Sequence, residues 1–212
     1  MKLPNFSFEK RLWKKGIKII VGLDEVGRGA FAGPLVVGAV VYKKGFKITK
    51  EVRINDSKKL TKLQREKADR WIRKNALGYA ICEISAKRVD SWGISKMTYS
   101  GFRGVVKTLQ DRIGTRVDYL LIDAIYIPYT RGLPVAQKQQ AIIHGDARSF
   151  TIASASIVAK VYRDKLMAAL GKRYKKYHWD QNKGYGTLKH RKSIKKFGLT
   201  KYHRRTFVHF LN

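Results

Sequence analysis

Cysteine, long apolar runs and acidic side chains are scarce in this sequence. Cys82 is the only cysteine among 212 residues, so the chain can form neither an internal disulfide nor a cysteine-based zinc site. No apolar run approaches the roughly 20 residues that a membrane-spanning helix needs. The first residues also carry polar side chains where a signal peptide has its apolar segment. We therefore expect a cytoplasmic protein with no membrane partner, and we expect it to be a monomer.

The shortage of acids leaves the chain strongly basic. Asp and Glu number 15 against 46 Lys and Arg, which gives a formal net charge of +31 at pH 7. Such a charge is tolerated when the partner is a polyanion, and nucleic acid is the commonest one. Hydrophobic residues make up 44% of the chain, which excludes a disordered polyelectrolyte. The composition predicts a folded protein that binds nucleic acid.

Apolar and glycine patterning predicts an α/β domain. β-branched, mostly continuous apolar runs indicate strands at 17–23, 34–42, 77–84 and 117–122. Helical periodicity or composition indicates helices at 61–75, 94–113 and 149–170. The order of these elements favours a mixed sheet covered by helices.

Three local expectations accompany these elements. The first helix begins with a capping box at residues 61–64, and we expect it to bury one face that includes Leu60, Leu63 and Trp71. Cys82 lies within the third strand, where we expect a buried and inert thiol. On the long third helix, Ser156, Lys160 and Arg163 are four and three residues apart and would share one face.

The composition changes after residue 170. Between 172 and 205 there are 13 Lys or Arg residues and one acid, Asp180, with aromatic residues between them. We predict one domain over residues 1–170 and a basic, helical C-terminal subregion over 171–212 packed on the same domain. Its charge suits contact with a nucleic-acid backbone.

Carboxylates stand close to the ends of two predicted strands. Asp24 and Glu25 follow one apolar strand and Asp123 follows another, while Asp146 precedes the long helix. If the two strands are parallel neighbours, these groups converge at the carboxyl edge of the sheet, where open α/β sheets place their sites. Converging carboxylates repel unless a hard cation such as Mg²⁺ or Mn²⁺ neutralises them. An Asp after a strand is also a common turn former or helix cap, so spacing alone leaves both interpretations open.

Residues 22–29 read Gly-Leu-Asp-Glu-Val-Gly-Arg-Gly and are followed by Gly33 and Pro34. This string resembles the signature of the ribonuclease HII family, prokaryotic enzymes that cut the RNA strand of RNA/DNA hybrids. Further segments resemble family motifs in family order, at residues 56–60, 121–123, 145–146, 155–164, 183–185 and 203–207. The resemblance implies an RNase H-like fold, in which a central mixed five-stranded sheet is flanked by helices and residues 1–170 form the catalytic domain.

The resemblance also implies a catalytic and metal-binding site. It assigns the catalytic role and the binding of Mg²⁺ or Mn²⁺, two ions during catalysis, to four carboxylates: Asp24, Glu25, Asp123 and Asp146. The sequence departs from the usual family pattern at Ala124, His144 and Gly186. None of these departures removes a carboxylate.

Substrate contacts are implied at several further positions. Gly27, Arg28 and Gly29 match the family element that approaches the ribose, whose 2′-hydroxyl distinguishes RNA from DNA. Tyr185 matches the family tyrosine that packs on the sugar after the ribonucleotide. Three further residues are assigned to phosphate contacts, with solvated or structural roles left open: Ser57, Lys58 and Lys160.

The predicted function is that of an endoribonuclease. It would hydrolyse the RNA strand of RNA/DNA hybrids and incise 5′ of single ribonucleotides in duplex DNA by two-metal-ion hydrolysis, leaving 5′-phosphate and 3′-hydroxyl ends and initiating ribonucleotide excision repair. The expected partners are RNA/DNA hybrid and ribonucleotide-containing duplex DNA. The sequence leaves open whether a sliding clamp is a partner. Such a partner would bind the C-terminal tail, residues 207–212, which we expect to pack on the core instead. Two alternatives remain: a non-catalytic basic nucleic-acid binder, and an integrase or junction resolvase that shares the fold.

Overall fold

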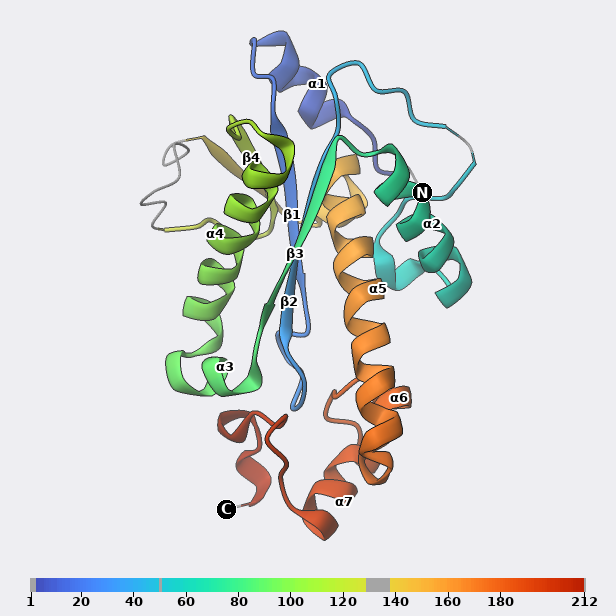
Figure 1. Ribbon diagram of the computed structural model, residues 1–212, viewed down its shortest axis with the longest axis vertical. Coiled ribbons are helices and arrows are strands. Elements are labelled where there is room, and N and C mark those ends of the chain that lie inside the picture. The colour runs from blue at the N-terminus through green and yellow to red at the C-terminus, as the bar shows by residue number, and fades with distance from the viewer. Residues whose placement is uncertain (1–2, 50, 129–137, 212) are drawn as a thin grey trace.

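The computed structural model describes residues 3–49, 51–128 and 138–211 (Figure 1). Five strands form one sheet in the order β3-β2-β1-β4-β5. Their bounds are β1 Ile20–Val26, β2 Leu35–Val41, β3 Gly78–Ile84, β4 Tyr119–Asp123 and β5 Gln139–Ile142. β1 pairs antiparallel with β2 and parallel with β4, which confirms the expected mixed five-stranded sheet.

Helices cover both faces of this sheet, with α5 on one side and α4 on the other (Figure 1). The helices are α1 Ser7–Lys14, α2 Lys62–Asn75, α3 Ala86–Trp92, α4 Ile94–Ile113, α5 Phe150–Arg173, α6 Trp179–Asn182 and α7 Leu188–Phe197. α5 lies unusually close to β1, because a Cβ on Gly22 would be 2.2 Å from the Thr151 carbonyl carbon. Glycine at this position therefore allows the first turn of the long helix to lie against the strand that carries Asp24.

The four predicted strands and three predicted helices are all present, and the capping box of α2 is complete. The expected buried face of α2 is partly wrong. Leu60 and Trp71 are buried in one apolar cluster, although Leu60 precedes the helix, whereas Leu63 is 71% exposed. Cys82 does lie in β3, but its side chain is only half-buried. Sequence patterning did not indicate α1, α3 or β5.

The basic C-terminal segment packs on the rest of the fold through its own apolar cluster. Buried Tyr177, Trp179, Ile194 and Val208 contact one another, together with Met167 of α5 and Ala32 of the loop after β1. Val208 belongs to the tail, which therefore packs on the core as expected. The predicted boundary at residue 170 falls inside α5, and the division of the chain there stays a prediction. None of the helices in the described ranges is long and apolar enough to cross a membrane.

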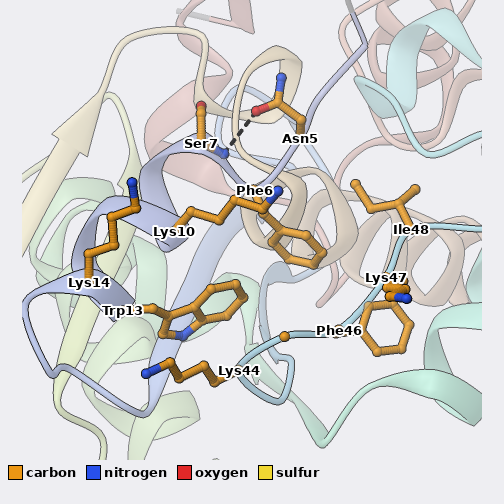
Figure 2. A pocket seen from close by; sticks show the side chains of 11 residues that line it. Asn5, Phe6, Ser7, Lys10, Trp13, Lys14, Lys44, Phe46, Lys47 and Ile48 are labelled. Atoms are coloured by element: carbon orange, nitrogen blue, oxygen red, sulfur yellow. Dashed lines mark hydrogen bonds between the residues drawn. The ribbon is translucent and has the colours of Figure 1, made fainter.

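A cavity of about 770 Å³ lies between α1 and residues 44–48 (Figure 2). Phe6, Trp13 and Phe46 give it apolar walls, and lysine side chains surround it. None of the site residues predicted from the sequence lines this cavity. They gather around a different one.

Candidate active site

The four predicted carboxylates line one cavity of about 470 Å³. The parallel pairing of β1 with β4 places Leu23 beside Ile122, so Asp24 and Asp123 come next at the same edge of the sheet. Asp146 lies in a short 3-10 helix, Gly145–Ala147, directly after β5 and before α5. The Gly145 N–H donates to Asp123 Oδ1 at 2.6 Å, which ties this helix to the end of β4. The parallel arrangement that the sequence argument required is therefore present.

Burial and mutual repulsion raise the pKa values of three of these acids. Burial raises the pKa of Asp24 well above its usual value, and the charges of Glu25, Asp123 and Asp146 raise it further. Burial and the Asp123 charge raise the pKa of Glu25 to about 7 against the opposing effect of Arg28. The pKa of Asp146 rises to about 6 through burial and the charges of Asp56 and Asp123. The cavity is therefore an unfavourable place for several negative charges without a cation.

The donor chemistry of this cavity fits a hard divalent cation. All four groups are carboxylates, which are the ligands that Mg²⁺ and Mn²⁺ prefer. One oxygen, Glu25 Oε2, is buried and has no hydrogen-bond partner within the described residues. Over the same residues, no three His, Cys, Asp or Glu side chains already stand together as a ligand set. The carboxylates would thus hold a metal by their chemistry, without a closed ligand cage formed in advance.

Ser57, Lys58 and Lys160 line the same cavity. The Lys58 charge lowers the pKa values of both Glu25 and Asp146. This lysine therefore stabilises the ionised form of two of the carboxylates. Sequence reasoning missed Ser156, whose side chain hydrogen-bonds to Asp24 and lies 3.0 Å from Ser57 Oγ. Its signal in the sequence was a serine four residues before Lys160 on the same helix.

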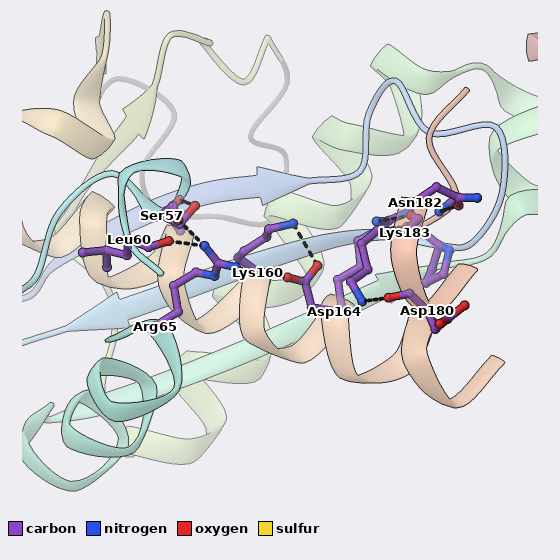
Figure 3. A network of polar contacts seen from close by, with 12 residues as sticks. Ser57, Leu60, Arg65, Lys160, Asp164, Asp180, Asn182 and Lys183 are labelled. Atoms are coloured by element: carbon purple, nitrogen blue, oxygen red, sulfur yellow. Dashed lines mark hydrogen bonds and ion pairs between the residues drawn. The ribbon is translucent and has the colours of Figure 1, made fainter. Parts of the chain in front are cut away.

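A polar network holds Lys160 in place (Figure 3). Its Nζ donates to Asp164 Oδ1 at 2.8 Å, and the other oxygen of Asp164 is 3.8 Å from the Arg65 guanidinium. Arg65 in turn donates to the carbonyls of Ser57 and Leu60. The network therefore connects the cavity-lining lysine of α5 to the segment that carries Ser57 and to α2.

Arg204 contacts the loop between β1 and β2, residues 27–33, which we call the glycine-rich loop. Sequence reasoning did not assign Arg204 to the site. Its side chain is fully buried and donates to three carbonyls, those of Gly27 at 2.7 Å, Arg28 at 2.8 Å and Gly33 at 3.0 Å. No carboxylate in the described part of the chain forms an ion pair with it. Burial and the charge of Arg163 lower the pKa of Arg204 to about 10. Backbone dipoles, rather than an acid, thus compensate this buried cation.

The inward carbonyls fix the direction of the loop amides. All peptide bonds in the described structure are trans, so an N–H points opposite to the carbonyl of the same peptide group. The Gly27 and Arg28 carbonyls face Arg204, which directs the N–H groups of Arg28 and Gly29 away from the core. Neither N–H has a protein acceptor in the regions that the structure describes. Since both residues line the cavity, the loop presents two open donors there.

Arg163 is a second buried cation that donates to backbone carbonyls, and one of these lies in the turn that carries Tyr185. It is fully buried in α5 and donates to Pro34 O at 2.9 Å, Ala32 O at 3.1 Å and Lys183 O at 2.9 Å. Its guanidinium carbon lies 5.4 Å from the centre of the Tyr185 ring. One buried side chain therefore joins the loop after β1 to the tyrosine turn. The expectation of a shared polar face with Lys160 did not predict this burial.

A pair of histidines supports the same turn. His190 Nδ1 is 2.9 Å from Tyr185 O, and its Nε2 accepts from Trp179 Nε1 at 3.0 Å and lies 3.2 Å from His203 Nε2. The Thr200 N–H donates to His203 Nδ1. These partners define the tautomers, with His190 donating from Nδ1 to Tyr185 O and His203 donating from Nε2 to His190.

Two of the departures from the family pattern adopt left-handed backbone conformations. Ala124 has φ +52° and His144 has φ +53°, which an L side chain rarely adopts. Gly186 is explained by packing, because a Cβ there would lie 2.3 Å from the Phe31 ring. Any side chain at position 186 would therefore require the Phe31 ring to shift.

Comparison with known proteins gives a consistent family. The family model described as Ribonuclease HII matches residues 21–210. Ribonuclease HII of Caldanaerobacter subterraneus subsp. tengcongensis is 40% identical over 201 residues, covering 95% of this chain and 78% of that protein. Ribonuclease HII of Dehalococcoides mccartyi is 40% identical over 205 residues, covering 97% and 93%.

Solved structures share the fold at lower identity. The ribonuclease H2 from Pyrococcus horikoshii has a TM-score of 0.75 and 24% identity, covering 91% of this chain and 96% of that one. The RNase HII in a complex with PCNA from Archaeoglobus fulgidus has a TM-score of 0.69 and 22% identity, covering 88% and 94%. Bst-RNase HIII in complex with Mn²⁺ has a TM-score of 0.70 and 16% identity, covering 89% and 67%.

Proposed function

This chain belongs to the ribonuclease HII family and is therefore an RNase H-type endoribonuclease, and we propose that it also incises duplex DNA 5′ of single embedded ribonucleotides. Its activity on RNA/DNA hybrids would involve the same cavity. The products would carry 5′-phosphate and 3′-hydroxyl ends, and the incision would initiate ribonucleotide excision repair in the cytoplasm. The observation that carries the proposal is the meeting of the carboxylates with the glycine-rich loop in one cavity.

The catalytic role in this proposal lies with Asp24, Glu25, Asp123 and Asp146, which would hold Mg²⁺ or Mn²⁺. Two bound ions would stabilise the attacking and leaving oxygens of the phosphodiester. The raised pKa values and the unpartnered Glu25 oxygen support this role. Both indicate that ionised carboxylates are unfavourable in this cavity unless a cation compensates their charge. Lys58 and Lys160 would contact phosphates beside the carboxylates.

Recognition of the ribose in this proposal depends on the open N–H groups of Arg28 and Gly29. A 2′-hydroxyl can accept from such donors, whereas a 2′-deoxy sugar offers nothing in their place. The Arg28 side chain lies 3.7 Å from Glu25 Oε1 and 3.5 Å from Thr98 Oγ1, and is held beside the cavity where a phosphate would lie. The Tyr185 ring, held by Arg163, would pack on the sugar that follows the ribonucleotide.

The direct test is incision of a duplex that carries one ribonucleotide, assayed with Mg²⁺ and with Mn²⁺. We expect one cut 5′ of the ribonucleotide and none in the matching all-DNA duplex. Tyr185→Ala should impair this substrate more than a long RNA/DNA hybrid, because the hybrid offers many sites. An intact single-ribonucleotide duplex, with the hybrid still cleaved, would restrict the enzyme to hybrids. Equal losses of Tyr185→Ala on both substrates would remove Tyr185 from junction recognition.

A further inference from the structure

One tryptophan of this chain is exposed while the other three are buried. The Trp92 side chain is 57% exposed at the end of α3, whereas Trp13, Trp71 and Trp179 lie in the core. An exposed tryptophan leaves a large apolar surface in water, and tryptophan is enriched where proteins bind their partners. Trp92 is therefore a candidate contact residue outside the cavity already described.

The surroundings of Trp92 are basic and open. The Lys96 ammonium lies 4.4 Å from the centre of the Trp92 ring, within cation–π distance. Ser91, Gly93 and Ser95 beside it are exposed as well. From residue 91 to residue 110 the sequence contains no acid. This surface, which we call the Trp92 platform and define by Trp92 and Lys96, thus combines a flat apolar ring with a positive charge.

Two connections fix the platform relative to the glycine-rich loop. Four residues into α4, Thr98 Oγ1 lies 3.5 Å from the guanidinium of Arg28. On the other side, the carboxylate of Asp90 in α3 accepts from the backbone N–H groups of Arg205 and Thr206. Arg205 is the next residue after Arg204, which holds the loop carbonyls. Figure 1 shows α3 at the end of the sheet where the C-terminal segment also lies.

We propose that the Trp92 platform is a second nucleic-acid contact, which binds the duplex beside the ribonucleotide. The Trp92 ring would pack on the apolar face of a sugar, and Lys96 would pair with the adjoining phosphate. Such a contact positions the duplex without reading its sequence. The proposal rests on the proposed function, because it needs a duplex seated at the glycine-rich loop. It adds a contact that neither the carboxylates nor the loop supplies.

Intrinsic fluorescence tests this contact, because Trp92 is the exposed tryptophan. The full chain is titrated with a duplex carrying one ribonucleotide, with metal chelated so that no incision occurs, while a dye on the duplex reports binding by anisotropy. We expect the duplex to quench the tryptophan emission. Trp92→Phe should abolish most of the quenching, and the matched control Trp13→Phe should retain it.

Affinity and kinetics provide the second readout. Trp92→Ala should weaken duplex binding about 5- to 30-fold, in line with the loss of one aromatic contact at an interface. Lys96→Gln should weaken binding less and reduce its salt dependence. Both variants should raise KM for incision and leave kcat nearly unchanged, because neither residue touches the reacting phosphodiester. A purely structural role would instead lower the melting temperature.

The outcomes separate this proposal from the function on which it rests. Saturable duplex binding with unchanged tryptophan emission, or with wild-type affinity in Trp92→Ala and Lys96→Gln, would overturn the platform and leave the nuclease assignment intact. Quenching through Trp92 without any incision in Mg²⁺ or Mn²⁺ would support the platform and count against the proposed incision.

Discussion

Replacement of Arg204 tests how the buried cation controls the site. In Arg204→Gln the guanidinium disappears, and with it the donors to the carbonyls of Gly27, Arg28 and Gly33. The Gly27 carbonyl retains a contact with the Ala30 N–H at 3.4 Å. The carbonyls of Arg28 and Gly33 have no second donor in the described ranges. We therefore expect one buried acceptor, the Gly33 carbonyl, and one half-buried acceptor, the Arg28 carbonyl, to be left with at most a partial replacement from the glutamine amide.

Each buried acceptor without a partner costs about 1–3 kcal/mol. The Gly33 carbonyl meets this condition and the half-buried Arg28 carbonyl costs less, so the free energy of unfolding falls by about 1–5 kcal/mol and a chain of this length melts roughly 3–15 °C lower. The loop carbonyls also lose their fixed direction, so the N–H groups of Arg28 and Gly29 no longer face the cavity. We expect kcat/KM on a single-ribonucleotide duplex to fall about 10- to 100-fold, as when an outer-shell support is removed. Arg204→Lys should fall between the wild type and Arg204→Gln.

The assays are thermal or urea unfolding and incision kinetics at a temperature where every variant is folded. Arg205→Gln is the matched control, because this neighbouring side chain is exposed. It should stay within about 0.5 kcal/mol of the wild type. If Arg204→Gln matches that control in both stability and incision, the loop does not depend on the buried guanidinium and the reasoning is wrong.

Three further predictions concern other parts of the site. Asp123→Asn should lose more than about 100-fold in incision rate. It should melt at or above the wild-type temperature, because it removes a charge that repels Asp24 and Glu25. A fall in both the incision rate and the melting temperature would indicate a folding defect instead. Gly27→Ala should cost about 2–4 kcal/mol of unfolding free energy, because φ is +90° and the new Cβ would lie 2.3 Å from Arg163 Nε. Gly29→Ala meets nothing within 4 Å and should be near neutral in the same denaturation series. Burial lowers the pKa of His203 from 6.5 to about 4, so the unfolded chain takes up this proton first and the contribution of His203 to stability should fall between about pH 6.5 and pH 4. The raised pKa values of Glu25 and Asp146 act in the opposite direction over this range, so the contribution is measured as the difference between the wild type and His203→Gln. A pH dependence of stability that is the same in His203→Gln as in the wild type would contradict this account.

Local patterns predicted much of the scaffold because short-range forces decide it. Apolar runs fix β1 and β4, since such segments bury both faces of a sheet. The capping box fixes the start of α2 through two hydrogen bonds within four residues. β5 escaped prediction because two of its four residues, Gln139 and Gln140, are polar and three are only partly buried, so that pairing with β4 is what makes the segment a strand. Leu63 was placed on the wrong face because periodicity within one helix does not say which side the core occupies.

The residues of the candidate site also fall into two groups, those that local sequence predicted and those that only the tertiary structure identified. The sequence by itself determined which carboxylates stand at strand ends and that a glycine-rich loop follows the first of them, because these facts depend on neighbours along the chain. Only the tertiary structure decided that Arg163 and Arg204, two cations in a chain with a net charge of +31, are buried supports rather than surface charges. The carbonyls that compensate Arg204 at the glycine-rich loop lie more than 170 residues away in the sequence. No local pattern can report such partners, and their dipoles are what makes burial of the charge possible.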